Sequence, residues 1–135
     1  MPLLLDTGVL YALADADDDW HRRSRAYLAT NRDVLLIPVT VVPEVCYLLR
    51  SRLGAVAESR FVQSVGDEEL SLEPVMPRDF KRCTELLAKY PDIGFVDASV
   101  VAVAERLKLR TIATTDHRHF GSLRPAHLES FELVP

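Results

Sequence analysis

Short apolar runs alternate with amphipathic stretches along the whole chain, and this alternation restricts the folds that the chain can adopt. The segments 3–5 and 34–37 are apolar runs that predict buried strands. Weaker strand signals cover 70–73, 111–113 and 131–134. Because strands that alternate with helices pair most readily side by side and in parallel, the pattern indicates an α/β domain with a largely parallel sheet.

Helical periodicity fills the segments between these strands. The predicted helices are, in chain order, 9–13, a segment from Asp18 or Asp19 through Leu28, 41–53, 55–65, 77–89 and 95–109. Thr40 is expected to cap the helix at 41–53. The helix at 95–109 is apolar on nearly all sides, which predicts that it is buried.

Length and composition indicate one globular domain over residues 1–135. A chain of 135 residues with 48% hydrophobic and 27% charged residues can form its own core. No apolar stretch approaches the length of a membrane span, and the first residues lack the basic start of a signal peptide. Only two cysteines are present, so a reduced, cytoplasmic protein without a membrane partner is expected.

The net charge of −4 argues against a basic module that binds nucleic acid through phosphate neutralisation alone. Nucleic acid stays open as a partner, because carboxylates gathered in one pocket can bind a divalent cation, and the cation reverses the local sign of charge. The location of the acidic residues therefore decides the matter.

Four carboxylates stand in apolar surroundings: Asp6, Glu44, Asp97 and Asp116. A carboxylate in such a context is costly unless it is paired, hydrogen-bonded or bound to metal. Hard oxygen ligands of this kind suit Mg²⁺ or Mn²⁺. Each acid taken singly also has a structural interpretation, as a turn residue or as an acid that favours a helix N-terminus.

The positions of two of these acids add weight to a functional interpretation. Asp6 directly follows the first predicted strand, and Asp116 follows the fourth. In open parallel sheets, ligands bind beyond the carboxyl ends of the strands, near the point where the strand order reverses. We therefore expect a site at this edge of the sheet.

Four segments in order carry a resemblance to a known family. They are LLDTGVL at 4–10, VPEV at 42–45, VDASVVA at 96–102 and TTDHRHF at 114–120. The chain resembles the PIN domain and, within that family, the VapC-type toxins of bacterial toxin–antitoxin pairs. The resemblance runs from end to end of the chain and implies a three-layer PIN-like fold, with a central, largely parallel sheet flanked by helices.

The same resemblance implies a metal-dependent ribonuclease that hydrolyses RNA phosphodiester bonds with Mg²⁺ or Mn²⁺. Asp6, Glu44, Asp97 and Asp116 take the places of the family's acidic residues. Asp6 and Asp97 would be the most direct metal ligands, and Glu44 and Asp116 would complete the site through waters or a second ion.

Supporting residues and partners are also implied by the resemblance. Thr7 or Thr115 would support the acids by hydrogen bonds. Gly8 departs from the family pattern, in which a small polar residue is commoner, and this puts one supporting hydrogen bond in doubt. The family further implies a homodimer that is neutralised by a cognate antitoxin, whose C-terminal segment covers or enters the acidic pocket.

Two rival functions remain open on the sequence alone. One is a non-catalytic PIN-like module that binds RNA or protein and keeps its acids for stability. The other is a magnesium-dependent phosphatase or receiver-like domain, which the acid after the first strand would suit. The second rival is weakened because no lysine ends a later strand near the site.

Several other residues could contribute to binding. Trp20 and Tyr27 lie at helical spacing and are expected to pack against the core or a dimer partner rather than to stack on bases. The arginines within 22–25 are interpreted as a solvated helix face, although they could contact RNA phosphates or an acidic antitoxin segment. His117 and His119 carry only a weak zinc signal, so a loop-packing or substrate-facing role is expected for them.

Overall fold

The computed structural model describes all 135 residues and contains one five-stranded sheet flanked by helices. The strands are β1 (Leu3–Leu5), β2 (Leu35–Pro38), β3 (Ser71–Glu73), β4 (Thr111–Ala113) and β5 (Glu132–Val134). The helices are α1 (Thr7–Ala14), α2 (His21–Thr30), α3 (Val41–Leu53), α4 (Ala55–Gly66), α5 (Pro77–Lys89), α6 (Phe95–Leu107) and α7 (His117–Ser122). Every helix is too short or too polar to traverse a lipid bilayer.

The sheet is parallel throughout, with the strand order β3-β2-β1-β4-β5. This confirms the fold class predicted from the alternation of strands and helices. The chain runs outward from β1 to β2 and β3, and then returns to the other side of β1 for β4 and β5. The strand order therefore reverses between β1 and β4, which is where open parallel sheets bind ligands.

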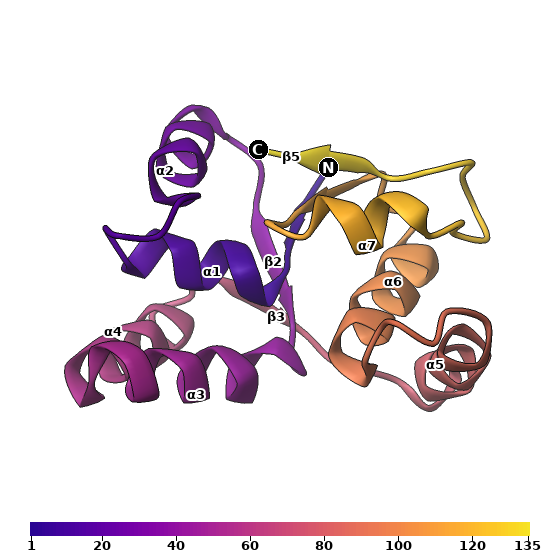
Figure 1. The fold of residues 1–135 in the computed structure, drawn as a ribbon, viewed down its shortest axis with the longest axis horizontal. Coiled ribbons are helices and arrows are strands. Elements are labelled where there is room, and N and C mark those ends of the chain that lie inside the picture. The colour runs from indigo at the N-terminus through magenta and orange to yellow at the C-terminus, as the bar shows by residue number, and fades with distance from the viewer.

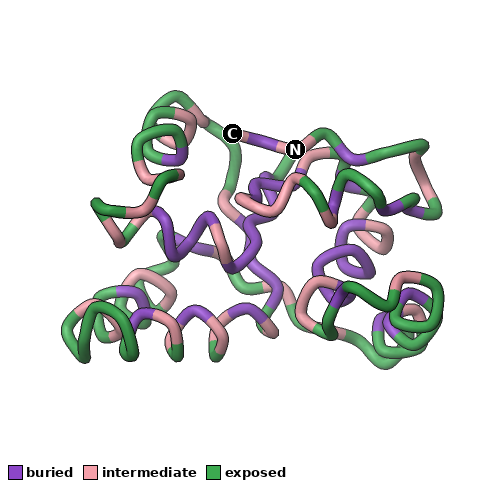
Figure 2. The backbone as a smooth tube through the Cα atoms, viewed as in Figure 1, coloured by how far each residue is buried: buried purple, intermediate pink, exposed green.

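The helices cover the sheet as two outer layers (Figure 1). The helices α1, α2, α3 and α4 lie to one side of the strands, and α5, α6 and α7 lie to the other. The strands between them form the centre of the core, and Leu4, Leu5, Ile37 and Ile112 have no exposed surface. Figure 2 shows the same distribution, with buried backbone in the central strands, α1 and α6, and mostly exposed backbone in α2.

The predicted burial of α6 is confirmed. Its residues Ala98 to Ala104 are all buried in succession, as expected for a helix that is apolar on nearly all sides. The helix ends at Leu107 rather than Leu109, because Lys108 adopts a left-handed conformation with φ of 56°. Leu109 is buried beyond the end of the helix.

Three local predictions need correction. Thr40 does not cap α3: its own backbone is helical, and its hydroxyl instead pairs with Ser99 Oγ at 2.6 Å. The second helix begins at His21, because the Asp18 carboxylate accepts a hydrogen bond from the Trp20 amide and closes a turn before the helix. No helix was predicted after the fourth strand, whereas the short helix α7 follows it and is capped by the Asp116 side chain.

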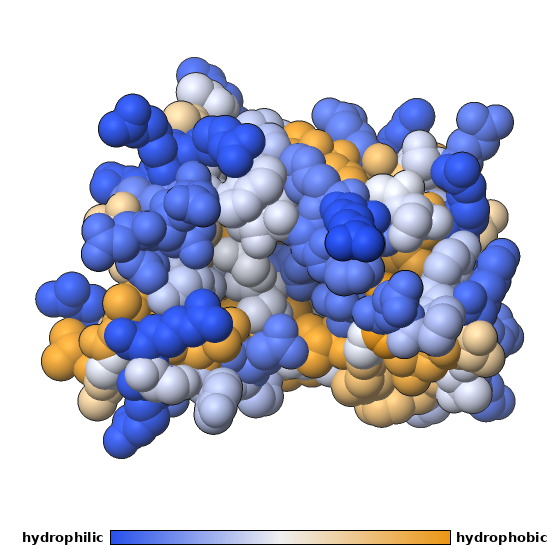
Figure 3. All heavy atoms as spheres, in the orientation of Figure 1, coloured by the Kyte–Doolittle hydropathy of each residue, from blue (hydrophilic) through white to orange (hydrophobic).

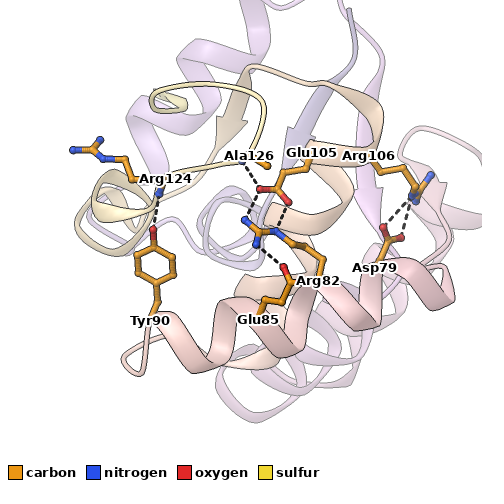
Figure 4. Close-up of polar contacts among 8 residues, drawn as sticks. All are labelled: Asp79, Arg82, Glu85, Tyr90, Glu105, Arg106, Arg124 and Ala126. Carbon is orange, nitrogen blue, oxygen red and sulfur yellow. Dashed lines mark hydrogen bonds and ion pairs between the residues drawn. The ribbon is translucent and has the colours of Figure 1, made fainter.

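Two arginine–carboxylate ion pairs join α5 to α6 (Figure 4). Arg106 on α6 donates through Nε to both Asp79 carboxylate oxygens at 3.0 and 3.1 Å. Arg82 on α5 donates to both carboxylate oxygens of Glu105 at 2.7 and 3.0 Å. Arg106 also pairs with Glu73 at 2.9 Å, and the Asp79 side chain is only 3% exposed, so removing Asp79 would take away one of the two carboxylates that compensate the Arg106 charge.

We expect Asp79→Ala to lower the free energy of unfolding by about 1–3 kcal/mol, because the Met76 amide loses its acceptor and the largely buried Arg106 guanidinium keeps only Glu73 as an ionic partner. Urea unfolding followed by circular dichroism measures the change. Glu85→Ala is the matched control: Glu85 is 67% exposed and pairs with Arg82, so its loss should cost less than about 1 kcal/mol. Equal effects of the two substitutions would contradict the structural role assigned to Asp79.

Candidate active site

The four acidic residues singled out in the sequence all stand at the beginnings of helices. Asp6 immediately precedes α1, Glu44 and Asp97 lie in the first turns of α3 and α6, and Asp116 is the N-cap of α7. Helix N-termini carry partial positive charge, which favours a carboxylate at each place. The parallel topology brings these helix starts to the carboxyl edge of the sheet, at the reversal of strand order.

Asp6 is the most buried of the four acids, with 4% of its surface exposed. Its pKa is raised from 3.8 to about 7, mainly by burial and also by the charges of Asp97 and Glu44. Hydrogen bonds from the Thr7 amide and the Thr114 hydroxyl partly oppose this rise. Asp6 is thus a carboxylate held at a place where its negative charge is costly.

The pKa of Asp97 responds to the charges of two of the other acids. Burial raises its pKa, and the nearby charges of Asp116 and Glu44 raise the pKa further. The neighbouring His119 acts in the opposite direction and lowers the pKa of Asp97. Since Asp6 also responds to Asp97 and Glu44, the structure brings all four predicted residues into one interacting group.

Thr114 connects the ends of β1 and β4 beneath this group. Its hydroxyl donates to Asp6 Oδ2 at 3.0 Å and accepts a hydrogen bond from the Asp116 amide at 2.9 Å. The strands themselves meet here, because the Asp6 amide donates to the Ala113 carbonyl at 2.9 Å. The resemblance implied Thr7 or Thr115 as the supporting hydroxyl, whereas the hydroxyl that bonds Asp6 is that of Thr114.

Thr7 and Thr115 have other roles around Asp6. The Thr7 amide donates to Asp6, but the buried Thr7 hydroxyl has no hydrogen-bond partner. Thr115 lies against Gly8, and a Cβ atom built on Gly8 would clash with the Thr115 hydroxyl. A side chain at position 8 would therefore require the Thr115 hydroxyl to move.

Both carboxylate oxygens of Asp116 contact His119, a residue of the helix α7 that Asp116 caps. Its Oδ1 accepts a hydrogen bond from the His119 amide at 3.0 Å, and its Oδ2 pairs with His119 Nδ1 at 2.8 Å. The ring of His117 pairs through Nε2 with the Thr114 carbonyl at 3.1 Å. Both histidines therefore pack within the loop that carries Asp116, which matches the loop-packing role expected for them.

Only one of the two Asp6 carboxylate oxygens is hydrogen-bonded to another side chain. Asp6 Oδ1 is buried without a hydrogen-bond partner, so one hard oxygen lone pair points into the protein unsatisfied. No group of three or more acidic, histidine or cysteine side chains in this structure lies close enough together to hold a metal ion. This arrangement fits Mg²⁺ or Mn²⁺, which bind through one or two carboxylates and keep several waters.

A separate, mainly apolar cavity lies away from the four acids. A cavity of about 480 Å³ opens among α1, α3 and α4 and is lined mainly by apolar side chains such as Leu10, Leu49 and Phe61. None of the four carboxylates lines it. The acidic group therefore lies outside that hollow, and the two features are separate parts of the surface.

A doubly wound parallel sheet with four interacting acids at its switch point defines an α/β protein with a candidate metal-dependent hydrolytic site. The chain belongs to the PIN domain family, whose model matches residues 3–123. The identification of the family from the four sequence segments is thus confirmed.

Relatives and solved structures agree with this membership. The chain is 31% identical to Ribonuclease VapC26 of Mycobacterium tuberculosis over 98% of this chain and 100% of that protein. Its fold matches Mycobacterium tuberculosis VapC20, a sarcin–ricin-loop-cleaving toxin, with a TM-score of 0.83 at 21% identity over 94% and 98% of the two chains. It also matches VapBC2 of Rickettsia felis bound to a promoter DNA fragment, with a TM-score of 0.71 at 17% identity and full coverage of both chains.

The raised pKa of Asp6 predicts a specific pH dependence of stability in metal-free buffer. Between about pH 4 and pH 7 the folded protein keeps a proton that the unfolded chain has lost, so the free energy of unfolding falls as pH rises. Asp6→Asn removes the charge and should therefore raise stability at pH 8, by an amount on the order of a few kcal/mol. Urea unfolding at pH 4 and pH 8 measures both effects.

The control for this comparison is Asp92→Asn, which neutralises an exposed acid outside the site and should leave the pH dependence unchanged. Added Mn²⁺ should stabilise the wild type and have much less effect on Asp6→Asn. A variant Asp6→Asn that is less stable than the wild type at pH 8 would show that the Asp6 charge is not costly in the fold.

Proposed function

We propose that this protein is a metal-dependent ribonuclease that hydrolyses RNA phosphodiester bonds in the cytoplasm, as the toxin of a toxin–antitoxin pair. The observation that carries the proposal is the convergence of four carboxylates at the switch point of the sheet, with Asp6 Oδ1 buried and unpartnered. The match to Ribonuclease VapC26 over nearly the whole chain supports the RNA substrate.

Asp6 and Asp97 are the proposed direct ligands of Mg²⁺ or Mn²⁺, because they are the two acids whose pKa values burial and neighbouring charge raise. A bound divalent cation would lower the pKa of a coordinated water and stabilise negative charge on the phosphodiester. Glu44 faces the same group, and Asp116 would contribute through water because His119 already occupies its oxygens.

The remaining residues orient this machinery. Thr114 fixes the Asp6 carboxylate by donating to Oδ2, which leaves Oδ1 free for a ligand. The pair Thr40–Ser99 joins the start of α3 to the start of α6, and so sets Glu44 relative to Asp97. Water would be the nucleophile, and no covalent enzyme intermediate is required.

The two rival functions have less support. A non-catalytic module would have no need for several acids at a place where charge is costly, since an uncompensated buried carboxylate destabilises the fold. A phosphatase or receiver-like site would need a lysine after a later strand, but β2, β3 and β5 are followed by Val39, Pro74 and Pro135.

We expect Asp97→Asn to reduce metal-dependent cleavage of RNA at least about a hundredfold, since several kcal/mol of transition-state stabilisation depend on the cation. Single-turnover cleavage of a labelled RNA, with Mn²⁺ and with EDTA, measures the loss. EDTA should abolish cleavage by the wild type.

Asp92→Asn provides the control variant, because it removes an exposed acid outside the group and should cleave at the wild-type rate. Circular dichroism shows whether each variant is folded. Undiminished metal-dependent cleavage by folded Asp97→Asn, or cleavage by the wild type that survives EDTA, would exclude the proposed site.

We further propose that the protein forms a homodimer and is neutralised by a cognate antitoxin. Solved structures with this fold include toxin–antitoxin complexes from Klebsiella pneumoniae and Rickettsia felis. A surface for self-association is offered by Phe80 and Phe95, which are 52% and 38% exposed and stack with ring centroids 5.4 Å apart. The antitoxin's C-terminal segment would cover the four carboxylates of the candidate site.

The antitoxin proposal predicts that a small protein encoded immediately upstream of this chain's gene forms a stable complex with it on co-expression. The complex should show no RNA cleavage in Mn²⁺, and cleavage should return when the partner is removed by limited proteolysis. Size-exclusion chromatography with light scattering gives the stoichiometry. A complex that cleaves RNA at the rate of the free protein would contradict neutralisation.

A further inference from the structure

Trp20 occupies an unexpected position in this fold. It is the chain's only tryptophan, and it stands before α2, at the end of the turn closed by Asp18, rather than on a core-facing side of the helix. It is half-buried and does not belong to the set of apolar side chains that pack against the core. Of the two expected roles, packing against the core holds for Tyr27 and not for Trp20, and packing of Trp20 against a dimer partner stays a prediction.

The neighbours of Trp20 are cationic and aromatic instead. The guanidinium carbon of Arg23 lies 3.8 Å from the centroid of the Trp20 ring, which places the cation over the ring face. Trp20 also contacts His117, which lies far away in the sequence: the two ring centroids are 5.0 Å apart, with an interplanar angle of 50°. Arg23 is exposed, so the stack faces solvent on its guanidinium side.

Backbone contacts hold both segments of this stack in place. The Trp20 amide donates to Asp18 Oδ1 at 2.9 Å, and the neighbouring His21 ring pairs with the Ala12 carbonyl at 2.7 Å. The His117 ring pairs with the Thr114 carbonyl at 3.1 Å. A flat surface that is already ordered loses little conformational entropy when a ligand binds to it.

The stack is also joined to the acidic group. His117 directly follows Asp116, and Thr114, which holds the His117 ring, donates through its hydroxyl to Asp6. In the face shown in Figure 3, hydrophilic side chains cover α2, and over α7 they alternate with more apolar ones. Exposed Arg22, Arg25 and Arg118 add positive charge to these two helices, beside a site that is otherwise acidic.

We propose that the Trp20–Arg23 stack is a binding platform for one unpaired nucleobase of the RNA substrate, next to the acidic site. The base stacks on the outer face of the Arg23 guanidinium, which Trp20 holds flat, and the arginine charge contacts a neighbouring phosphate. Only a base outside a duplex exposes a face for such stacking, so the platform selects single-stranded segments or loops. This inference rests on the proposed ribonuclease function.

Planarity separates this platform from a simple patch of positive charge. Arg23→Lys keeps the charge and removes the flat face, whereas Trp20→Ala keeps the arginine and removes the surface that orients it. Arg22→Lys is the matched control, because Arg22 is the adjacent exposed arginine on the same helix and has no aromatic ring beneath it.

The test measures binding of a fluorescein-labelled single-stranded oligoribonucleotide to the full chain in EDTA, by anisotropy and by the fluorescence of Trp20. We expect saturable binding by the wild type with a change in tryptophan emission. Trp20→Ala and Arg23→Lys should each weaken binding about 5- to 100-fold, whereas Arg22→Lys should bind within about twofold of the wild type. A duplex RNA of the same sequence should not distinguish Trp20→Ala from the wild type.

Wild-type affinity in both Trp20→Ala and Arg23→Lys, or no saturable binding by the wild type, would overturn the platform. If these variants instead lose only the co-expressed antitoxin, this surface binds protein and the proposal is also overturned. Cleavage assays in Mn²⁺ distinguish failure of the platform from failure of the ribonuclease proposal. If the wild type binds RNA as expected but does not cleave it, the ribonuclease proposal fails and the platform is retained. If the folded variants cleave RNA with unchanged KM, the platform fails and the ribonuclease proposal is retained.

Discussion

The cost of keeping the Asp6 charge in a buried place governs the arrangement of the site. Asp6 ends the central strand of the sheet, where the protein surrounds it almost completely. The Thr114 hydroxyl and the Thr7 amide satisfy part of its hydrogen-bonding capacity, and one oxygen is left without a partner. A folded chain carries such an unfavourable group where a ligand compensates it, and a hard cation is the ligand that an unpartnered carboxylate oxygen fits.

Much of the fold follows from local sequence features. The runs at 3–5 and 111–113 are short and apolar, and helical periodicity between the strands leaves parallel pairing as the simplest arrangement. The acids of the candidate site were identified for a similar reason, since a carboxylate among apolar residues, such as Asp97, has few purely structural explanations. That these acids lie near one another depends on the topology of the sheet, which local sequence features do not determine and which the family resemblance implied.

Other features were beyond local reasoning because they depend on contacts between distant segments. The choice of Thr114 over Thr115 as the partner of Asp6 is set by the register of β1 against β4, in which Leu5 lies opposite Ala113. Thr40 looked like a helix cap in the sequence, but Ser99 binds its hydroxyl from another helix. Helical spacing predicted that Trp20 lies within the second helix and packs against the core or a dimer partner, whereas a turn at Asp18 places Trp20 before the helix.

The close contact between Gly8 and Thr115 couples two positions that lie far apart in the chain. A side chain at position 8 would occupy the space that the Thr115 hydroxyl fills, so a serine could enter there only if residue 115 became smaller or turned away. Substitutions at the two positions are therefore epistatic, and their energetic effects should not add. A larger residue at position 8, after the first strand, would therefore be accepted only together with a change at position 115, after the fourth strand. The contact thus limits which substitutions the acidic edge of the sheet can accept one at a time.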